Sequence, residues 1–589
     1  MNMRYSNFRF FSLFCVLMLQ LQLAACGGGG DSTSQQAPEW PIAKEVFTTA
    51  EQQILPIGLP DSTPHVNPRD ASLYDVFGYS AWQAGTGLSH VKRTDFAPGN
   101  TATNSARLLT FFTITDVHIT DKESPAQVNY IGWSAPYGPE SFQLSGAYAP
   151  TILATTQVLD AAVQTINALH KKTPFDFGIA LGDAINNAQY NELRWYIDVL
   201  DGKVITPSSG AHVGADTIDY QKAFKAAGLN KAIPWYQTLG NHDQYMMGTY
   251  YETAKTQAAH IGSAVLNAGI PPTAAAMAGT GFYMGVVDGS TPYGDIIGAG
   301  PESLFPVPPT VIADPDRHSL VTANSTSLNW MKEFFATTSN PVGHGFTQAN
   351  IDNDFASYSF QPKPDVPIKV IVLDDTCKGD GQPSYALGCL DQTRLDWLTN
   401  ELQKGQDNNQ LMIISAHVPI YPQNSLTDPS KGNFPFFRTP DFTDASLLAV
   451  LRNYPNLIMW ISGHRHVNTV TPHPYNPADP NDHPENSFWM VETASLRDFP
   501  QHFRTFDIRR NSDNNISIVI TNVDPAVSAG TPAAKSRGYA VGTSRIFGAD
   551  DTATPPTRAL TDSNAYNAEL VKQLTPTMQG IIATKGTAL

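Results

Sequence analysis

The chain has 589 residues, of which 41% are hydrophobic and 15% are charged. This composition can fill a large core and excludes an intrinsically disordered chain. The formal net charge is −16, and there is no run rich in Lys or Arg. Because a protein that binds nucleic acid without sequence preference needs a cationic surface to displace counterions, we expect no stable nucleic-acid binding.

Residues 1–25 predict a secretory signal peptide. Two arginines precede an apolar stretch over 10–23, which is too short for a membrane-spanning helix. The stretch ends in Leu-Ala-Ala-Cys, which resembles a bacterial lipobox and implies lipidation of Cys26. The alternative is an ordinary signal peptide with a coincidental cysteine. Gly27 follows the cysteine, which by resemblance to lipoprotein sorting implies anchoring in the outer membrane, facing the periplasm.

Removal of the signal peptide and lipidation would leave two cysteines, Cys377 and Cys389. In an exported protein a lone close pair most often forms a local disulfide, which we expect here. The alternative is two free buried thiols. A zinc site is disfavoured because there is no second pair nearby.

The chain between the leader and the C-terminus divides by composition. Residues 26–105 are rich in Pro, Ser, Thr and Asp, which predicts a flexible tether and an irregular segment packed on the domain that follows. Residues 106–525 predict one domain with insertions, the largest at about 245–326, around the mouth of a site. Residues 526–589 predict a polar, loop-like C-terminal extension with one short helix at 566–574.

Within 106–525, β-favouring apolar runs alternate with helical patterns, which predicts an α/β layered fold. Three further strand candidates near the end have little helix between them and indicate a second sheet packed against the first. The expected strands are 108–114, 175–181, 235–239, 368–373, 411–415, 457–462, 488–492, 503–508 and 516–521, and the expected helices are 154–170, 192–200, 395–402 and 445–451.

Five short motifs of metal-ligating residues each follow one of these strands. Open α/β sheets bind ligands at the carboxyl ends of their strands, so residues far apart in sequence can converge there. An aspartate can be shared by two cations, and a bridged pair of divalent cations suits phosphate-ester hydrolysis. The motifs are Asp116-Val117-His118, Gly182-Asp183-Ala184-Ile185-Asn186, Gly240-Asn241-His242-Asp243, Ala416-His417 and Gly463-His464-Arg465-His466.

In this order the motifs resemble those of the calcineurin-like metallophosphoesterase superfamily, over about residues 108–470. The resemblance implies a β-sandwich flanked by helices, with long insertions, and two divalent or mixed-valence metal ions (Fe, Mn or Zn). It implies that Asp183 bridges the metals. The other implied ligands are Asp116, His118 and His466 for the first metal and Asn241, His417 and His464 for the second.

The same resemblance implies hydrolysis of phosphate mono- or diesters by attack of metal-bound hydroxide. His242 would contact the phosphoryl group and protonate or stabilise the leaving oxygen, and Asp243 would orient and charge that imidazole. Two rival functions stay open: a dedicated cyclic-nucleotide or other phosphodiesterase, and a non-catalytic lipoprotein that binds phosphate ligands on the same scaffold. The intact His242-Asp243 pair argues against the second rival.

Spacing adds local expectations. Asp116 and His118 are two residues apart, so side chains leaving an extended strand would point the same way, and His464 and His466 repeat the pattern. Arg465 would then face away, as a structural residue or, less favoured, a substrate contact.

Two further positions have competing interpretations. Asn186 stands where purple acid phosphatases carry a metal-bound tyrosine, which argues against their chromophore. It would either help to hold the site or cap a loop. For Asp374-Asp375 a structural role near the disulfide is favoured over a catalytic one.

Overall fold

The computed structural model describes residues 46–134, 148–268, 281–287, 289–323, 329–378, 388–420, 444–480, 482–548 and 566–589. The expected signal peptide and the lipidation site at Cys26 lie outside these ranges. Among the described residues, no helix combines the length and apolar character needed to cross a bilayer.

The first of two large sheets has the strand order β3-β20-β19-β18-β4-β5-β8, with β21 also paired to β4. Its β4, β5 and β8 run parallel to one another, so their carboxyl ends lie at one edge. The strands are β3 (Val91–Arg93), β4 (Asn104–Ile114), β5 (Phe177–Ala180), β8 (Trp235–Gln237), β18 (Phe503–Asn511), β19 (Ile516–Val523), β20 (Ala568–Lys572) and β21 (Thr587–Ala588).

The second large sheet has the order β12-β13-β14-β15-β17-β16. Its four central strands β13, β14, β15 and β17 are parallel. They are apolar almost throughout and buried on both faces, as parallel strands covered on each side require. The strands are β12 (Tyr358–Phe360), β13 (Ile368–Val372), β14 (Leu411–Ser415), β15 (Leu457–Ser462), β16 (Thr469–His473) and β17 (Phe488–Glu492).

One hydrophobic core joins the two sheets. It includes Phe111 and Ile179 of the first sheet and Val370 and Ile413 of the second. The rings of Phe111 and Phe506 stack with their centroids 4.5 Å apart. The same core holds apolar side chains of α2 (Thr155–Lys172) and α3 (Tyr190–Asp201), so these helices cover the first sheet.

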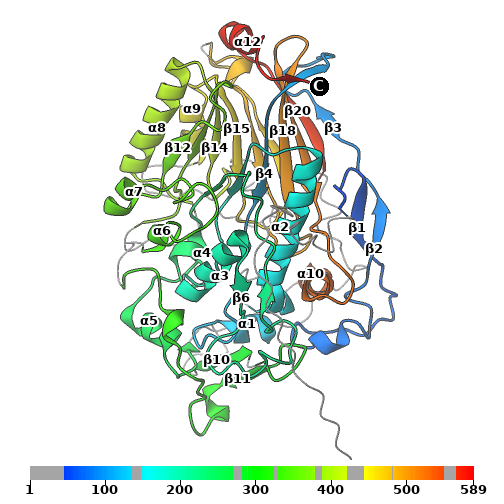
Figure 1. Ribbon diagram of the computed structural model, residues 1–589, viewed down its shortest axis with the longest axis vertical. Helices are drawn as coiled ribbons and strands as arrows, with labels where there is room; N and C mark the ends of the chain where they lie inside the picture. The colour runs from blue at the N-terminus through cyan, green and yellow to red at the C-terminus, as the bar shows by residue number, and fades with distance from the viewer. Residues whose placement is uncertain are drawn as a thin grey trace, which may run out of the picture. The chain divides into compact units, whose positions relative to one another are not determined.

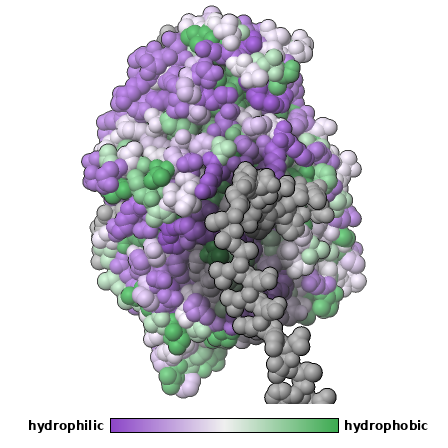
Figure 2. Space-filling model, in the orientation of Figure 1, coloured by the Kyte–Doolittle hydropathy of each residue, from purple (hydrophilic) through white to green (hydrophobic). Residues whose placement is uncertain are grey.

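A separate core fills the outer face of the second sheet. There, Leu398 and Leu402 of α8 (Gln392–Asp407) and Leu447 and Leu451 of α9 (Asp444–Leu451) pack on it. Figure 1 shows α8 and α9 beside β12, β14 and β15, and in Figure 2 the surface over this region is mostly hydrophilic. The architecture is therefore the layered α/β fold expected from the sequence, and the expected strands and helices of residues 106–525 are confirmed, with ends shifted by a few residues. The expected grouping of the last three strands in the second sheet is wrong, because only β17 lies there, whereas β18 and β19 belong to the first sheet.

Smaller elements surround the layers. A sheet in the order β11-β10-β9 lies with α1 and α5 below the large sheets in Figure 1. The remaining elements of this part are α1 (Asn129–Trp133), β6 (Val204–Ile205), β7 (Phe224–Lys225), α4 (Asn241–Gln244), α5 (Ala254–Ile261), β9 (Asn267–Ala268), β10 (Phe282–Val287), β11 (Ile296–Pro301), α6 (Trp330–Glu333) and α7 (Gln348–Asp352).

The two ends of the described chain are more ordered than the sequence indicated. Strands β1 (Gln52–Pro56) and β2 (Trp82–Thr86) pair with each other. The expected helix at 566–574 is wrong, because residues 568–572 form β20 between β19 and β3. The loop-like character expected after 526 is also wrong, since α10 (Pro532–Gly548) and α12 (Pro576–Ile582) are helices.

Candidate metal centre

The five motifs converge where the parallel strands of both sheets end. Asp116 and His118 follow β4, Asp183 follows β5, and Asn241 and His242 begin α4 after β8. His417 follows β14, and His464 and His466 follow β15. Among the described residues, three groups of His and Asp bring their ligand atoms within 4.8 Å of one another: Asp116, His118 and His466; His118, Asp183 and His242; and Asp183, His417 and His464.

Extended backbone does not explain this convergence. Asp116 and His118 have φ angles of 49° and 46°, and Asp183, His464 and His466 also lie in the left-handed region, at 50°, 77° and 59°. The expectation that alternate side chains leave an extended strand is therefore wrong. Left-handed conformations are unfavourable for residues with a Cβ and concentrate at functional sites, where the surrounding structure enforces them.

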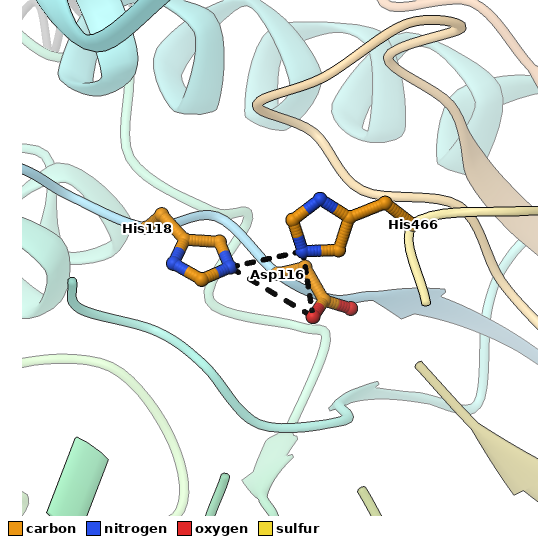
Figure 3. A group of neighbouring side chains, drawn as sticks. All are labelled: Asp116, His118 and His466. Atoms are coloured by element: carbon orange, nitrogen blue, oxygen red, sulfur yellow. Dashed lines mark hydrogen bonds and ion pairs between the residues drawn. The ribbon is translucent and has the colours of Figure 1, made fainter. Parts of the chain in front are cut away.

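The first group lies between β4 and the loop after β15 (Figure 3). His118 Nε2 is 3.1 Å from His466 Nε2, and His466 Nε2 is 3.3 Å from Asp116 Oδ1. His118 Nε2 is also 3.9 Å from Asp116 Oδ1 and 3.7 Å from Asp183 Oδ2. Three ligand atoms thus face one point, with the Asp183 carboxylate beside it.

The second group shares Asp183. His417 Nε2 is 3.2 Å from Asp183 Oδ2, 2.9 Å from Asn241 Oδ1 and 3.3 Å from His464 Nδ1. His464 Nδ1 is 3.2 Å from Asn241 Oδ1. The Asn241 amide nitrogen donates to the Gly248 carbonyl at 3.0 Å, which turns the amide oxygen toward the histidines. Asp183 Oδ2 is therefore common to both groups.

These distances fit the edges of a coordination polyhedron. With metal–ligand bonds of about 2.1 Å, ligand atoms at right angles lie about 3.0 Å apart and tetrahedral ones about 3.4 Å apart. The closest pairs here, 2.9 to 3.3 Å, match those values. The residues present therefore fit two metal ions.

The hydrogen-bond partners of the imidazoles support the same conclusion. His417 Nδ1 donates to the Leu181 carbonyl at 2.8 Å, and His466 Nδ1 donates to Asp498 Oδ2 at 2.6 Å. His118 Nδ1 lies 3.1 Å from Asn186 Oδ1. When these Nδ1 atoms carry the protons, every Nε2 lone pair points at another acceptor, which is repulsive unless a cation lies between them.

The charged side chains of the site also favour a cation among the ligand atoms. Burial disfavours charged imidazoles, but Asp183 outweighs it and raises the pKa of His417 to about 10, as Asp116 does for His466. Burial likewise opposes ionisation of Asp183, yet His417 and His242 hold its pKa well below the usual range. The carboxylates thus favour positive charge at these imidazoles, and metal binding would displace any protons that they hold.

Motif glycines let the ligand loops approach one another. Gly182 has φ of 101°, and a Cβ there would lie 2.7 Å from His417 Nδ1. A Cβ at Gly240 would collide with the Asp183 carboxylate. Both positions therefore require glycine for close approach, and Gly182 requires it for its backbone conformation as well.

Asp498 is a supporting residue that the motifs did not reveal. It lies six residues beyond the end of β17 and accepts a hydrogen bond from His466 Nδ1. A carboxylate behind a metal-ligating histidine fixes the tautomer and strengthens the ligand. The available signal was its place after a buried parallel strand, at the edge that carries the motifs.

The contacts of Asp243 do not support its expected role of orienting the imidazole of His242. Its carboxylate accepts main-chain hydrogen bonds from Gly240 at 2.9 Å and Ile185 at 3.2 Å. The imidazole of His242 instead uses Nδ1 to donate to the Asn186 carbonyl at 2.8 Å. Asp243 lies in the first turn of α4, where its carboxylate caps the backbone N–H of Gly240 instead of contacting the side chain of His242.

His242 lies at the centre of the site. Its ring centroid is 4.4 Å from that of His118, and only 3% of the residue is exposed. Burial lowers its pKa, while Asp183 opposes this change. With Nδ1 occupied by the Asn186 carbonyl, Nε2 is the atom that can exchange a proton with a substrate.

Several flanking residues have structural roles. Arg465 pairs with the buried carboxylate of Glu492, so it faces away from the site, as its spacing indicated. Asp375 accepts hydrogen bonds from the main chain of His417 at 3.2 Å and Val418 at 2.8 Å. Asp374 pairs with Lys378 at 3.1 Å.

The two remaining cysteines lie next to this network. Cys377 and Cys389 are disulfide-bonded, with their Cα atoms 4.6 Å apart. The Tyr245 hydroxyl donates to the Cys377 carbonyl, which connects the disulfide to the end of α4.

No family model matches the chain, and no curated protein matches it. Among solved structures it is similar to a dimetal phosphatase from Danio rerio, at 12% identity and a TM-score of 0.34, over 71% of this chain and 97% of that one. It is also similar to PhoD, at 11% identity and a TM-score of 0.27, over 79% of each chain. At such scores the likeness is loose, so the functional argument rests on the side chains of the site.

Proposed function

We propose that this chain is a dinuclear-metal-dependent phosphoesterase of the calcineurin-like type, which hydrolyses phosphate mono- or diesters. One observation carries the proposal. Seven side chains from five loops form two groups of ligand atoms that share Asp183, with distances that fit metal coordination.

The first metal would be held by Asp116, His118 and His466, and the second by Asn241, His417 and His464, with Asp183 between them. When bound, the two ions supply charge neutralisation for the phosphoryl group and acidify water for attack. Nitrogen and oxygen ligands of this kind admit Fe, Mn or Zn.

The other residues of the site act on the substrate or on the ligands. His242 Nε2 would donate to the leaving oxygen, and a phosphate dianion beside it would raise the pKa that burial lowers. Asn186 supports both histidines near it, because its carbonyl accepts from His242 and its amide oxygen lies beside His118. Asp498 would hold the ring of His466 in place.

We expect the full-length chain, purified in detergent and loaded with Mn, Zn or Fe, to hydrolyse chromogenic phosphate mono- or diesters. A chelator should abolish turnover and the same metal should restore it. The ratio of monoester to diester rates would separate a phosphatase from a dedicated phosphodiesterase. A folded protein that binds two metal ions and phosphate but turns over neither class of ester would support the binding-protein alternative.

We also propose that the protein is a lipoprotein of the bacterial cell envelope, anchored through Cys26. The Leu-Ala-Ala-Cys sequence after an apolar leader supports this. Cys26→Ser should move the protein from the membrane fraction to the soluble fraction in a fractionated bacterial host. Unchanged membrane retention, with the leader cleaved, would exclude the lipid as the main attachment.

A further inference from the structure

Glu192 lies in the first turn of α3 and is completely buried. Its Oε1 accepts from the Asp121 main-chain nitrogen at 2.8 Å. Its Oε2 accepts from the main-chain nitrogens of Asn186 at 3.2 Å and Asn187 at 2.8 Å. One carboxylate therefore gathers three backbone N–H groups from two separate segments.

These two segments are the loops that carry the carboxylate ligands. They already form a short parallel ladder, in which His118 donates to the Asp183 carbonyl and Ile119 to the Ala184 carbonyl, both at 3.1 Å. Asn186 donates back to the Ile119 carbonyl at 3.1 Å. Glu192 adds its three acceptor contacts where this ladder ends, so it joins the Asp116–His118 loop to the Asp183 loop.

Both loops need such support. Asp116, His118 and Asp183 all have left-handed φ angles, which are unfavourable for residues that carry a Cβ. Backbone strain of this kind is not relieved within the two loops themselves, so contacts from other residues must hold their conformation.

We propose that Glu192 is a positioning residue that sets the distance between the first-metal loop and the bridging Asp183, and hence the spacing of the two metal ions. The proposal rests on the metal centre of the proposed function but not on its substrate. Further contacts hold the segment that contains Asp121. Its Oδ2 accepts from Asn191 at 2.7 Å and pairs with Arg317 at 3.2 Å.

The test is Glu192→Gln in the full-length chain, loaded with Mn(II). The amide keeps one acceptor oxygen but places an NH2 group against main-chain N–H donors, so at least one of the three hydrogen bonds to residue 192 is lost. We expect binding of one Mn(II) to weaken by about 10- to 100-fold, as for other residues behind metal ligands. The electron paramagnetic resonance spectrum of the Mn(II) pair should also change, because the coupling of two ions depends on their separation.

Glu401→Gln is the matched control. Glu401 lies on α8 and pairs at 2.7 Å with Lys369, at the end of β13 away from the ligands. This variant makes the same chemical change in a partly buried ion pair, and it should leave the spectrum and the Mn(II) affinity as in the wild type.

A wild-type spectrum and affinity in Glu192→Gln would overturn the proposal, whatever its melting temperature. If Glu192→Gln does not fold, Glu192→Asp decides by the same measurement, since it keeps the charge and withdraws the carboxylate by one methylene. A wild-type protein that binds no Mn(II) pair would instead refute the metal centre itself. If the Mn(II) pair forms but the protein hydrolyses no ester, only the proposed activity is refuted, and the electron paramagnetic resonance spectrum still decides the positioning role of Glu192.

Discussion

Asp183→Asn should lose at least one of the two bound metal ions and lower phosphoesterase kcat by more than about 100-fold. Substitution of a residue that only hydrogen-bonds to a metal ligand typically lowers metal affinity or activity by about 10- to 100-fold. Asp183 should matter more, because it is the carboxylate that both ligand groups share. An amide is neutral and has a single oxygen to offer, so it cannot balance two cations. Metal analysis after desalting and steady-state kinetics measure the two effects.

Asp176→Asn is the matched control for this substitution. Asp176 stands just before the opposite end of β5, where it accepts from the Thr110 main chain at 2.7 Å and pairs with Lys363 at 3.3 Å. It should keep both metals and its activity. Two metals and wild-type activity in Asp183→Asn would refute the shared-ligand assignment.

His242→Ala should lower kcat by about 10²- to 10⁴-fold, the usual contribution of a general acid, with the metal content unchanged. The loss should be larger for an alkyl phosphate than for a nitrophenyl ester, because a good leaving group needs no proton. His242→Asn should resemble the alanine variant, since its amide can donate a hydrogen bond but cannot transfer a proton.

The exposed His212 provides the comparison, and His212→Ala should have no effect on kcat or metal content. An equal loss for both leaving groups would contradict proton donation by His242. Loss of a metal ion in His242→Ala would instead make this residue a ligand, as its place beside His118 and Asp183 allows geometrically.

The central layers could be predicted because their sequence signal is local. Runs such as 411–414 are continuously apolar, and only a buried strand or helix tolerates that pattern. Helix α10 was missed because Gly538 and Gly542 weaken its propensity, yet Gly542 packs where a Cβ would press on the Tyr74 ring. Strand β20 contains helix-forming residues, and its pairing with β19 and β3 overrides them.

The convergence of the motif residues could be predicted for a different reason, namely that metal chemistry restricts residue types and strand ends restrict their places. The residues that support the ligands without binding metal could not be predicted in this way. Glu192 contacts Asp121 from 71 positions away and Asp498 contacts His466 from 32, and only the place of Asp498 after a buried parallel strand gave a signal in the sequence. Asp243 was misassigned because adjacency to His242 in sequence does not imply contact, and its carboxylate bonds the backbone instead.

The ligands of the first group lie far apart in the chain, since His118 and His466 are separated by 348 positions. No fragment that ends before the loop after β15 contains the complete set, so the centre can be assembled only when nearly all of the domain is available. A chain exported in the unfolded state would therefore acquire its metals after translocation. The metal supply of the compartment in which folding is completed, rather than the ligands alone, would then decide which ions the mature protein carries.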